Sequence, residues 1–184
     1  MADQYEVAIV GSGPSGLSAG ARAAEKGMKH ILLETTDHAS DTIYKFQKKK
    51  FVMATPDIMP LRSDVSFEVG VREDILETWD KEIEEQSINI SYKSEVTAIT
   101  GEKGNFTLTL KDGRTINANH VVLSIGMQGN IRKLDVDGDD WEGVQYQLDD
   151  PEEYEDEQIV VVGAGDAAIE NAVALAAQNK VAIV

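Results

Sequence analysis

Residues 5–20 read YEVAIVGSGPSGLSAG, and this stretch decides the fold. The apolar run 5–10 predicts a strand, and the alanine-rich residues 17–26 predict a helix. Between them lie three glycines, Gly11, Gly13 and Gly16. A GxGxxG pattern between a strand and a helix is typical of a turn that binds the pyrophosphate of a dinucleotide.

Each glycine has its own reason to lack a side chain. Gly11 permits the tight turn, Gly13 lets the backbone approach a pyrophosphate, and Gly16 lets the helix lie close to the sheet. The helix start also offers N–H groups and the positive end of its dipole to phosphates. Pro14 gives up one donor there but fixes φ for the first turn.

Glu34 ends a second short apolar strand, Ile31–Glu34, which follows a helix stop at Gly27. In dinucleotide-binding β-α-β units, an acid that binds the ribose follows the first glycine by roughly 20 residues, and the sequence separation of Glu34 from Gly11 is close to this. The carboxylate can accept hydrogen bonds from both ribose hydroxyls and would repel a 2′-phosphate. A structural turn and a solvated strand end are the alternatives, and the β-α-β context favours the dinucleotide site.

The opening pattern recurs near the end of the chain. Ile159–Val162 predicts a strand, a helix is expected up to about Gln178, and Val181–Val184 begins another strand. The second motif uses Gly163, Gly165 and Ala168, with alanine at the helix-packing position. The residues that determine selectivity for NADH or NADPH are expected after Val184, so the sequence is compatible with either nucleotide.

The middle of the chain predicts one helix and several strands. The apolar face of residues 72–86 favours an amphipathic helix, and Asp112-Gly113 favours a hairpin turn. His120–Ile125 is uniformly apolar, so we expect it to be buried on both faces. Residues 35–71 predict irregular structure with short strand pieces around 51–53. Further strands are expected at Ile88–Tyr92, Glu95–Thr100, Phe106–Leu110 and Thr115–Ala118.

Composition limits the function. With 17 basic and 33 acidic residues, the 184-residue chain has a net charge of −16, which argues against nucleic acid or an anionic membrane as partner. The absence of cysteine excludes disulfides, thiolate metal sites and a dithiol redox centre within these residues. Asp135–Asp140 has its glycine at the wrong position for a calcium loop, so no metal site is expected. The N-terminus lacks a secretory signal, and a cytoplasmic location is expected.

The expected fold class is α/β, with two dinucleotide-binding units in series. Residues 1–125 form a Rossmann-like three-layer domain with an antiparallel meander, and residues 126–157 form an acidic connection. Residues 158–184 then begin a second Rossmann-like domain. Because this second domain is incomplete, we expect the chain to be a fragment of a longer protein.

The sequence resembles the two-domain flavoproteins of the thioredoxin reductase type within the pyridine nucleotide-disulfide oxidoreductases. The resemblance lies in GSGPSGLSAG at 11–20, VVLSIG at 121–126 and VVGAGDAAIENA at 161–172. It implies that the first unit binds FAD through Gly11, Gly13, Pro14, Ser15, Gly16, Glu34, Val96 and Gly126. It implies that the second unit binds NAD(P)H through Gly163, Gly165, Asp166 and Ala168.

The positions at which this sequence differs from the family pattern indicate which branch of the family it is most similar to. Thioredoxin reductases carry a CxxC upstream of the second glycine motif, where this chain has Val144–Gln147. The chain is therefore more similar to the ferredoxin–NADP reductases built on the same plan. Bacillithiol disulfide reductases are also similar, although they have a cysteine in place of Ser15. Flavin monooxygenases share GxGPSG but have an FxGxxxH segment that is absent here.

The resemblance implies an oxidoreductase that passes electrons from NAD(P)H through FAD to an unidentified acceptor, with no catalytic side chain identified. A dinucleotide-binding module without turnover is the alternative, and a monooxygenase is a minor one. An electron-acceptor protein and a second copy of the chain are the partners left open. Lys48-Lys49-Lys50 is either a solvated loop or a docking face for an acidic carrier.

Overall fold

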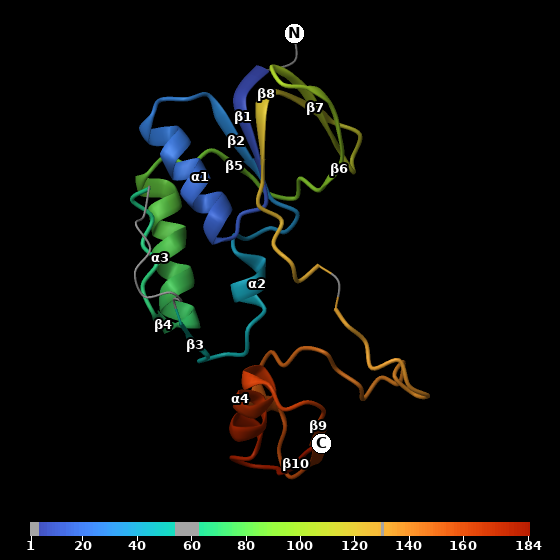
Figure 1. Ribbon diagram of the computed structural model, residues 1–184. Helices are drawn as coiled ribbons and strands as arrows, with labels where there is room; N and C mark the ends of the chain where they lie inside the picture. The colour runs from blue at the N-terminus through green and yellow to red at the C-terminus, as the bar shows by residue number, and fades with distance from the viewer. Residues whose placement is uncertain (1–3, 54–62, 130) are drawn as a thin grey trace. The chain divides into compact units, whose positions relative to one another are not determined.

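The computed structural model describes residues 4–53, 63–129 and 131–184 (Figure 1). The chain divides into two compact units. The first contains residues 1–44 and 51–130, and the second contains residues 45–50 and 131–184. The predicted boundaries at 125 and 157 remain a prediction, and each unit is described separately below.

The first unit is built on one six-stranded sheet in the order β5-β2-β1-β8-β7-β6. Strands β5, β2, β1 and β8 run parallel, whereas β8, β7 and β6 form an antiparallel meander. This is the predicted Rossmann-like arrangement with its meander. The strands are β1 (Gln4–Val10), β2 (His30–Leu33), β5 (Ile90–Ser91), β6 (Val96–Glu102), β7 (Asn105–Leu110) and β8 (Thr115–Leu123).

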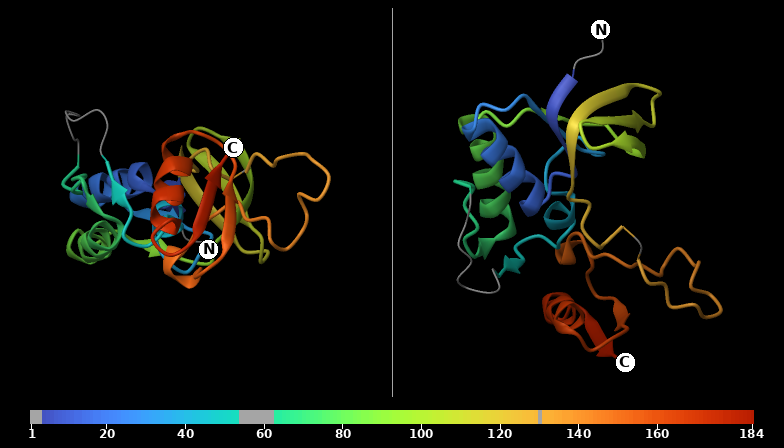
Figure 2. Two further views of the ribbon diagram at one scale, coloured as in Figure 1. Left: turned by 90° about the horizontal axis from the view of Figure 1, so that it is seen from below. Right: turned by 45° about the horizontal axis from the view of Figure 1, so that its top comes forward.

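Helix α1 (Pro14–Glu25) connects β1 to β2 and packs against the parallel half of the sheet, as the alanine-rich sequence predicts. Helix α3 (Arg72–Glu85) lies beside it (Figures 1 and 2). The amphipathic pattern of α3 is confirmed, because Ile75, Trp79 and Ile83 are its buried residues. The crossover from β1 through α1 to β2 brings the glycine turn and the end of β2 to the same edge of the sheet.

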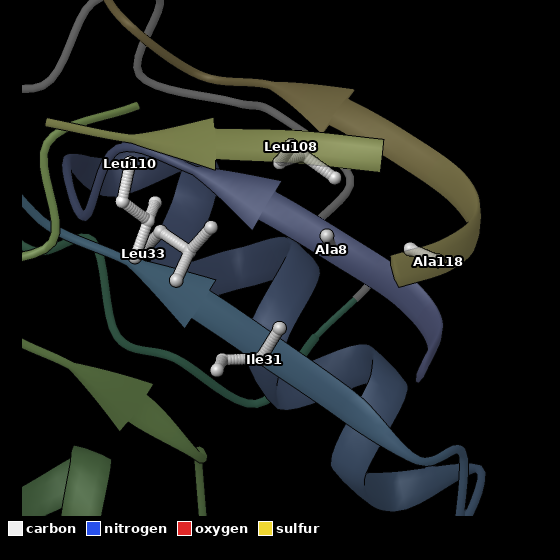
Figure 3. Packing of buried hydrophobic residues seen from close by; sticks show 6 residues of the cluster. All are labelled: Ala8, Ile31, Leu33, Leu108, Leu110 and Ala118. Atoms are coloured by element: carbon white, nitrogen blue, oxygen red, sulfur yellow. The ribbon is translucent and has the colours of Figure 1, made fainter. Parts of the chain in front are cut away.

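One buried hydrophobic cluster lies where the meander meets the parallel strands (Figure 3). Leu108 and Leu110 of β7 pack with Ala8 of β1 and with Ile31 and Leu33 of β2, and Ala118 of β8 completes the cluster. The alternation of leucine and threonine in β7 puts both leucines on this face. The buried cluster holds the end of β2 in place, and therefore also Glu34, which follows it.

Strand β8 corrects two predictions. The sequence predicts two strands, at 115–118 and 120–125, but the structure has one strand through Asn119 because β8 pairs with β7 over its first half and with β1 over most of its length. The prediction that its end is buried on both faces is wrong. Val122 is 36% exposed and Leu123 is 63% exposed.

The remaining described parts of this unit are short. Helix α2 (Asp41–Tyr44) was not predicted, and β3 (Phe51–Val52) pairs antiparallel with β4 (Gly70–Val71). Of residues 35–71, for which irregular structure is predicted, residues 54–62 lie outside the described residues. The hairpin at Asp112-Gly113 is confirmed, since the Gly113 N–H donates to the Leu110 carbonyl over 3.0 Å.

The second unit contains a smaller β-α-β element. Strands β9 (Gln158–Val161) and β10 (Lys180–Ile183) run parallel, and α4 (Asp166–Leu175), shorter than predicted, packs against them (Figure 2). The acidic stretch before β9 has only one 3-10 turn, η1 (Pro151–Glu153), among its described residues. Across 4–53, 63–129 and 131–184, no helix has the length and apolar character needed to cross a membrane.

Candidate functional site

The first glycine motif forms a tight corner between β1 and α1. Gly11 has φ +96°, and its N–H donates to the Leu33 carbonyl at the end of β2 over 2.9 Å. A Cβ on Gly16 would lie 1.9 Å from the Gly11 carbonyl oxygen, so the turn can close only if residue 16 is glycine. The protein's own packing therefore requires both residues.

Gly13 differs from these two glycines. Its φ is −67°, which any residue can adopt, and a Cβ placed on it would have no neighbour within 4 Å. Its carbonyl accepts the first helical hydrogen bond, from the Leu17 N–H, over 2.9 Å. Nothing in the described structure explains the missing side chain, whereas close approach of a ligand to the backbone would.

The start of α1 is open to a ligand. Its N-cap residue, Gly13, has no side chain that could cap it, and Pro14 and Ser15 are exposed. The first-turn N–H groups are thus available, and the helix dipole adds positive potential at this end. These are the properties that a diphosphate needs.

The Glu34 carboxylate points back into the glycine turn. Its Oε2 accepts from the Ser12 backbone N–H over 3.0 Å and from the Ser12 hydroxyl over 2.5 Å. Its Oε1 accepts from the Thr36 N–H over 3.0 Å. The turn and the acid, far apart in sequence, therefore meet at one edge of the sheet, as predicted.

Neighbouring groups set the charge and hydrogen-bonding state of this edge. Burial, together with the Asp80 and Glu34 carboxylates, raises the pKa of the Tyr92 hydroxyl above its ordinary value of 10.0, so it is a neutral donor at physiological pH. The His38 side chain and the Lys93 ammonium lower the pKa of Asp37. An open cavity of about 240 Å³ is lined by Thr35, Lys93, Glu95, Lys111 and Asp112.

Val96 and Gly126, which are expected at this site but lie outside the glycine motif, have different surroundings. Val96 begins β6 and packs against the core cluster, which accounts for a valine there without a ligand. Its segment does approach the site, because the Ser94 N–H donates to the Glu34 carbonyl over 2.7 Å. Gly126 has φ +64° and lies two residues after Ser124, whose carbonyl oxygen would lie 2.5 Å from a Cβ on Gly11. The end of β8 therefore borders the glycine turn.

The second motif repeats the geometry of the first. Gly163 has φ +117°, and its N–H donates to the Val184 carbonyl over 2.8 Å, as Gly11 does to Leu33. The Gly165 carbonyl accepts from the Ile169 N–H over 3.0 Å, and a Cβ on Gly165 would also have no neighbour within 4 Å. Asp166 begins α4, and Ala168 lies 3.8 Å from a Cβ built on Gly163.

The lysine run belongs to the second unit. Lys48 pairs with Asp150, Lys49 with Glu152 over 2.6 Å, and Lys50 with Glu170 of α4. Lys48 donates to Asp150 and lowers the pKa of that carboxyl, while Asp150 raises the pKa of Lys48. Three acids of the same unit thus offset the charge that the run would offer to an acidic carrier.

Sequence reasoning missed Ser12 and Thr36, which donate to the Glu34 carboxylate, and Ser40, whose N–H donates to Ser12 Oγ over 3.1 Å. Ser12 occupies a position at which the GxGxxG pattern specifies no residue. The only feature of the sequence that pointed to a role for Ser12 was a hydroxyl between two glycines. Within the three described ranges, no group of three or more His, Asp or Glu residues could hold a metal ion.

The chain is similar to known proteins over most of its length. Residues 8–184 match the family described as pyridine nucleotide-disulphide oxidoreductase. A ferredoxin–NADP reductase of Leuconostoc mesenteroides is 24% identical over 181 residues, covering 95% of this chain and 51% of that protein. A thioredoxin reductase of Helicobacter pylori is 31% identical over 183 residues, covering 93% and 52%. The chain thus spans about half the length of the curated relatives it matches.

Solved structures show the same fold. The bacillithiol disulfide reductase of Staphylococcus aureus superposes with a TM-score of 0.84 at 22% identity, over 98% of this chain and 57% of that one. A flavin monooxygenase from Stenotrophomonas maltophilia, in a mutant form, has a TM-score of 0.76 at 15% identity, over 98% and 57%. At these identities the likeness concerns the fold alone.

Proposed function

Because the chain belongs to the pyridine nucleotide-disulphide oxidoreductase family, we propose that it is part of a flavoprotein that moves electrons from NAD(P)H through FAD to an acceptor. Members of this family are FAD-binding oxidoreductases that use NAD(P)H. When bound, the two cofactors supply the hydride and electron transfer. The residues described here bind and orient them.

One observation carries the proposal. Gly13 and Gly165 are the middle glycines of the two motifs, and the protein's own packing requires neither of them to be glycine. Each lies directly before a helix without a side-chain cap. A bare backbone at an open helix N-terminus suits a diphosphate, which a side chain would hold away from the N–H groups.

In this proposal the first unit takes FAD. The N–H groups of Ser15 and Gly16 receive the pyrophosphate, Pro14 orients the first turn, and Glu34 accepts from the adenosine ribose. Val96 and Gly126 complete the FAD site, as the resemblance implies. The second unit takes NAD(P)H at Gly163, Gly165, Asp166 and Ala168.

The acceptor is proposed as a redox protein or a small molecule, reduced directly by the flavin, since this chain has no cysteine for a dithiol relay. The relatives named ferredoxin–NADP reductase favour a protein carrier. A cytoplasmic location remains the proposal that the sequence makes.

The test is a titration of the purified full-length protein that contains this chain. We expect flavin absorbance that bleaches under argon on addition of NADH or NADPH, and running both nucleotides side by side identifies the donor. A colourless protein that binds nucleotide without any redox change would instead establish the non-catalytic module. A Gly13→Ala variant should lose flavin while Gly129→Ala retains it, since both glycines have room for a Cβ and only Gly13 lies in the turn.

A further inference from the structure

The Glu34 carboxylate has four polar contacts with the residues that the structure describes. Oε2 receives the Ser12 N–H at 3.0 Å and the Ser12 hydroxyl at 2.5 Å. Oε1 receives the Thr36 N–H at 3.0 Å and lies 3.2 Å from the Thr36 hydroxyl. A carboxylate has about four acceptor positions, two on each oxygen. The contacts of Oε2 therefore fill that oxygen.

With respect to residues 4–53, 63–129 and 131–184, Oε1 keeps one open acceptor position. The Thr36 hydroxyl also lies 2.7 Å from the His38 carbonyl oxygen, and a hydroxyl has one proton to donate. The shorter contact, to His38, has the better geometry for a neutral hydrogen bond, so the proton goes there. Glu34 is 7% exposed, which leaves only a small part of the residue within reach of a ligand.

Ser40 fixes the direction of the Ser12 hydroxyl. The Ser40 N–H donates to Ser12 Oγ over 3.1 Å, and the Ser40 hydroxyl donates to the Ser12 carbonyl over 3.1 Å. Ser12 and Ser40 are both fully buried. Because Ser12 Oγ accepts from Ser40, its own proton is directed at Glu34. The second motif has no equivalent, since Ala164 occupies the place of Ser12.

We infer that Ser12 is a positioning residue that occupies Oε2 of Glu34 and leaves Oε1 as the single oxygen that binds a ribose hydroxyl. This inference rests on the proposed nucleotide site. The sequence alone suggested that Glu34 accepts from both hydroxyls. With Oε2 filled, one hydroxyl meets a charged acceptor and the other does not, so the two contribute unequally to binding.

The test measures the affinity of the chain for ADP, 2′-deoxy-ADP and 3′-deoxy-ADP by calorimetry. A hydrogen bond to a charged group is strong enough that losing it weakens binding about tenfold or more. We expect one deoxynucleotide to show this loss and the other to bind nearly as well as ADP. Ser12→Ala frees an acceptor position on Oε2, so the second hydroxyl can also meet the carboxylate, and the two deoxynucleotides should come to similar affinities.

Ser40→Ala is the matched control. It removes the hydroxyl bond to the Ser12 carbonyl but keeps the backbone N–H that directs the Ser12 hydroxyl, so the unequal losses should persist. If Ser12 only stabilised the turn, the two alanine variants would behave alike. Should Ser12→Ala fail to fold, Ser12→Cys keeps the shape with a weaker donor and should give a partial effect.

Two results would overturn the inference separately from the proposed function. Wild-type chain that binds ADP but loses both deoxynucleotides equally refutes the single acceptor. Unequal losses that survive in Ser12→Ala refute the role of Ser12. Wild-type chain that binds neither ADP nor FAD overturns the proposed nucleotide site itself, and the inference with it.

Discussion

Gly13 and Gly16 are three residues apart in one turn, yet the molecule needs them for different reasons. Gly16 is required by the fold, because the Gly11 carbonyl oxygen occupies the place of its side chain. Gly13 faces open space. The sequence pattern contains both as glycine, and only the structure separates the requirement of the fold from that of the ligand.

Alanine substitutions should separate the two roles. Gly16→Ala forces a Cβ to 1.9 Å from a carbonyl oxygen and should cost at least the roughly 1–3 kcal/mol typical of overpacking. Gly13→Ala should leave the free energy of unfolding within about 0.5 kcal/mol of wild type, as at an unconstrained site, but weaken ADP binding. Urea denaturation and calorimetry measure the two quantities. Equal destabilisation by both substitutions would contradict this assignment.

Leu108 has a structural role in the same unit. It is fully buried in the cluster that packs residues of the meander against residues of β1 and β2 (Figure 3). Leu108→Ala should lower the free energy of unfolding by about 2–5 kcal/mol, since it leaves a cavity in a packed core. Lys103→Ala, at an exposed position of the β6–β7 hairpin, is the control and should change it little. A Leu108→Ala loss no larger than that of the control would mean that the cluster is loosely packed.

At the scale of elements, α1 approaches its neighbours through a second small residue. A Cβ on Gly20 would lie 2.8 Å from Cγ2 of Ile88, which precedes β5 and is buried. Helix propensity alone would favour alanine at this position. The close contact explains why it is glycine, whereas Gly27 has open space and a φ of +64° and serves to end the helix, as the sequence predicts.

A double-mutant cycle tests this contact. Gly20→Ala should destabilise the chain by overpacking, and Ile88→Ala should destabilise it by leaving a cavity. In the double variant the new methyl group occupies part of that cavity, so the combined loss should be smaller than the sum of the single losses. Unfolding free energies from urea denaturation give the coupling. Strict additivity would show that the helix shifts away instead.

At the scale of the molecule, the second unit is assembled from two separate stretches of chain. Residues 45–50 lie between elements of the first unit in sequence, but they pack with residues 131–184. The Lys48 N–H donates to the Asp149 carbonyl over 2.9 Å, and the three lysines pair with three acids. In a chain of net charge −16, these lysines reduce repulsion within an acidic unit.

Acid should weaken this assembly. The folded pKa of Asp150 is lowered below 3.8, so the carboxylate stabilises the fold above that pH, and this contribution is lost as pH falls through the lower folded value. The raised pKa of Lys48 preserves the pair at alkaline pH up to at least 10.5. Asp150→Asn removes the charge but still accepts from the Glu152 N–H.

The measurement compares the chain that keeps Asp150 with the Asp150→Asn variant. Both carry Trp79→Phe, so that Trp141 of the second unit is the only tryptophan. Urea unfolding followed by tryptophan fluorescence should show the chain with Asp150 to be the more stable at pH 6. The advantage should shrink toward pH 3 and also in high salt, which screens an ion pair near the surface. A difference independent of pH would show that the ion pair does not stabilise the unit.

The sequence by itself determined both glycine turns, the helices after them and the position of Glu34 at a strand end. These features follow from local rules, since glycine spacing, alanine content and apolar runs act on neighbouring residues. The same rules predicted the hairpin at Asp112-Gly113 and the amphipathic face of α3.

Only the tertiary structure decided that β8 is one strand, that the lysine run joins the second unit, and that Ser12, bonded to Ser40, donates to Glu34. Each depends on groups far apart in sequence. Strand β8 continues through Asn119 because β1 pairs with the residues on both sides of it. The Glu34 oxygens differ because folding brings a buried serine to only one of them. Such contacts are fixed by chain packing, which no short window of sequence contains.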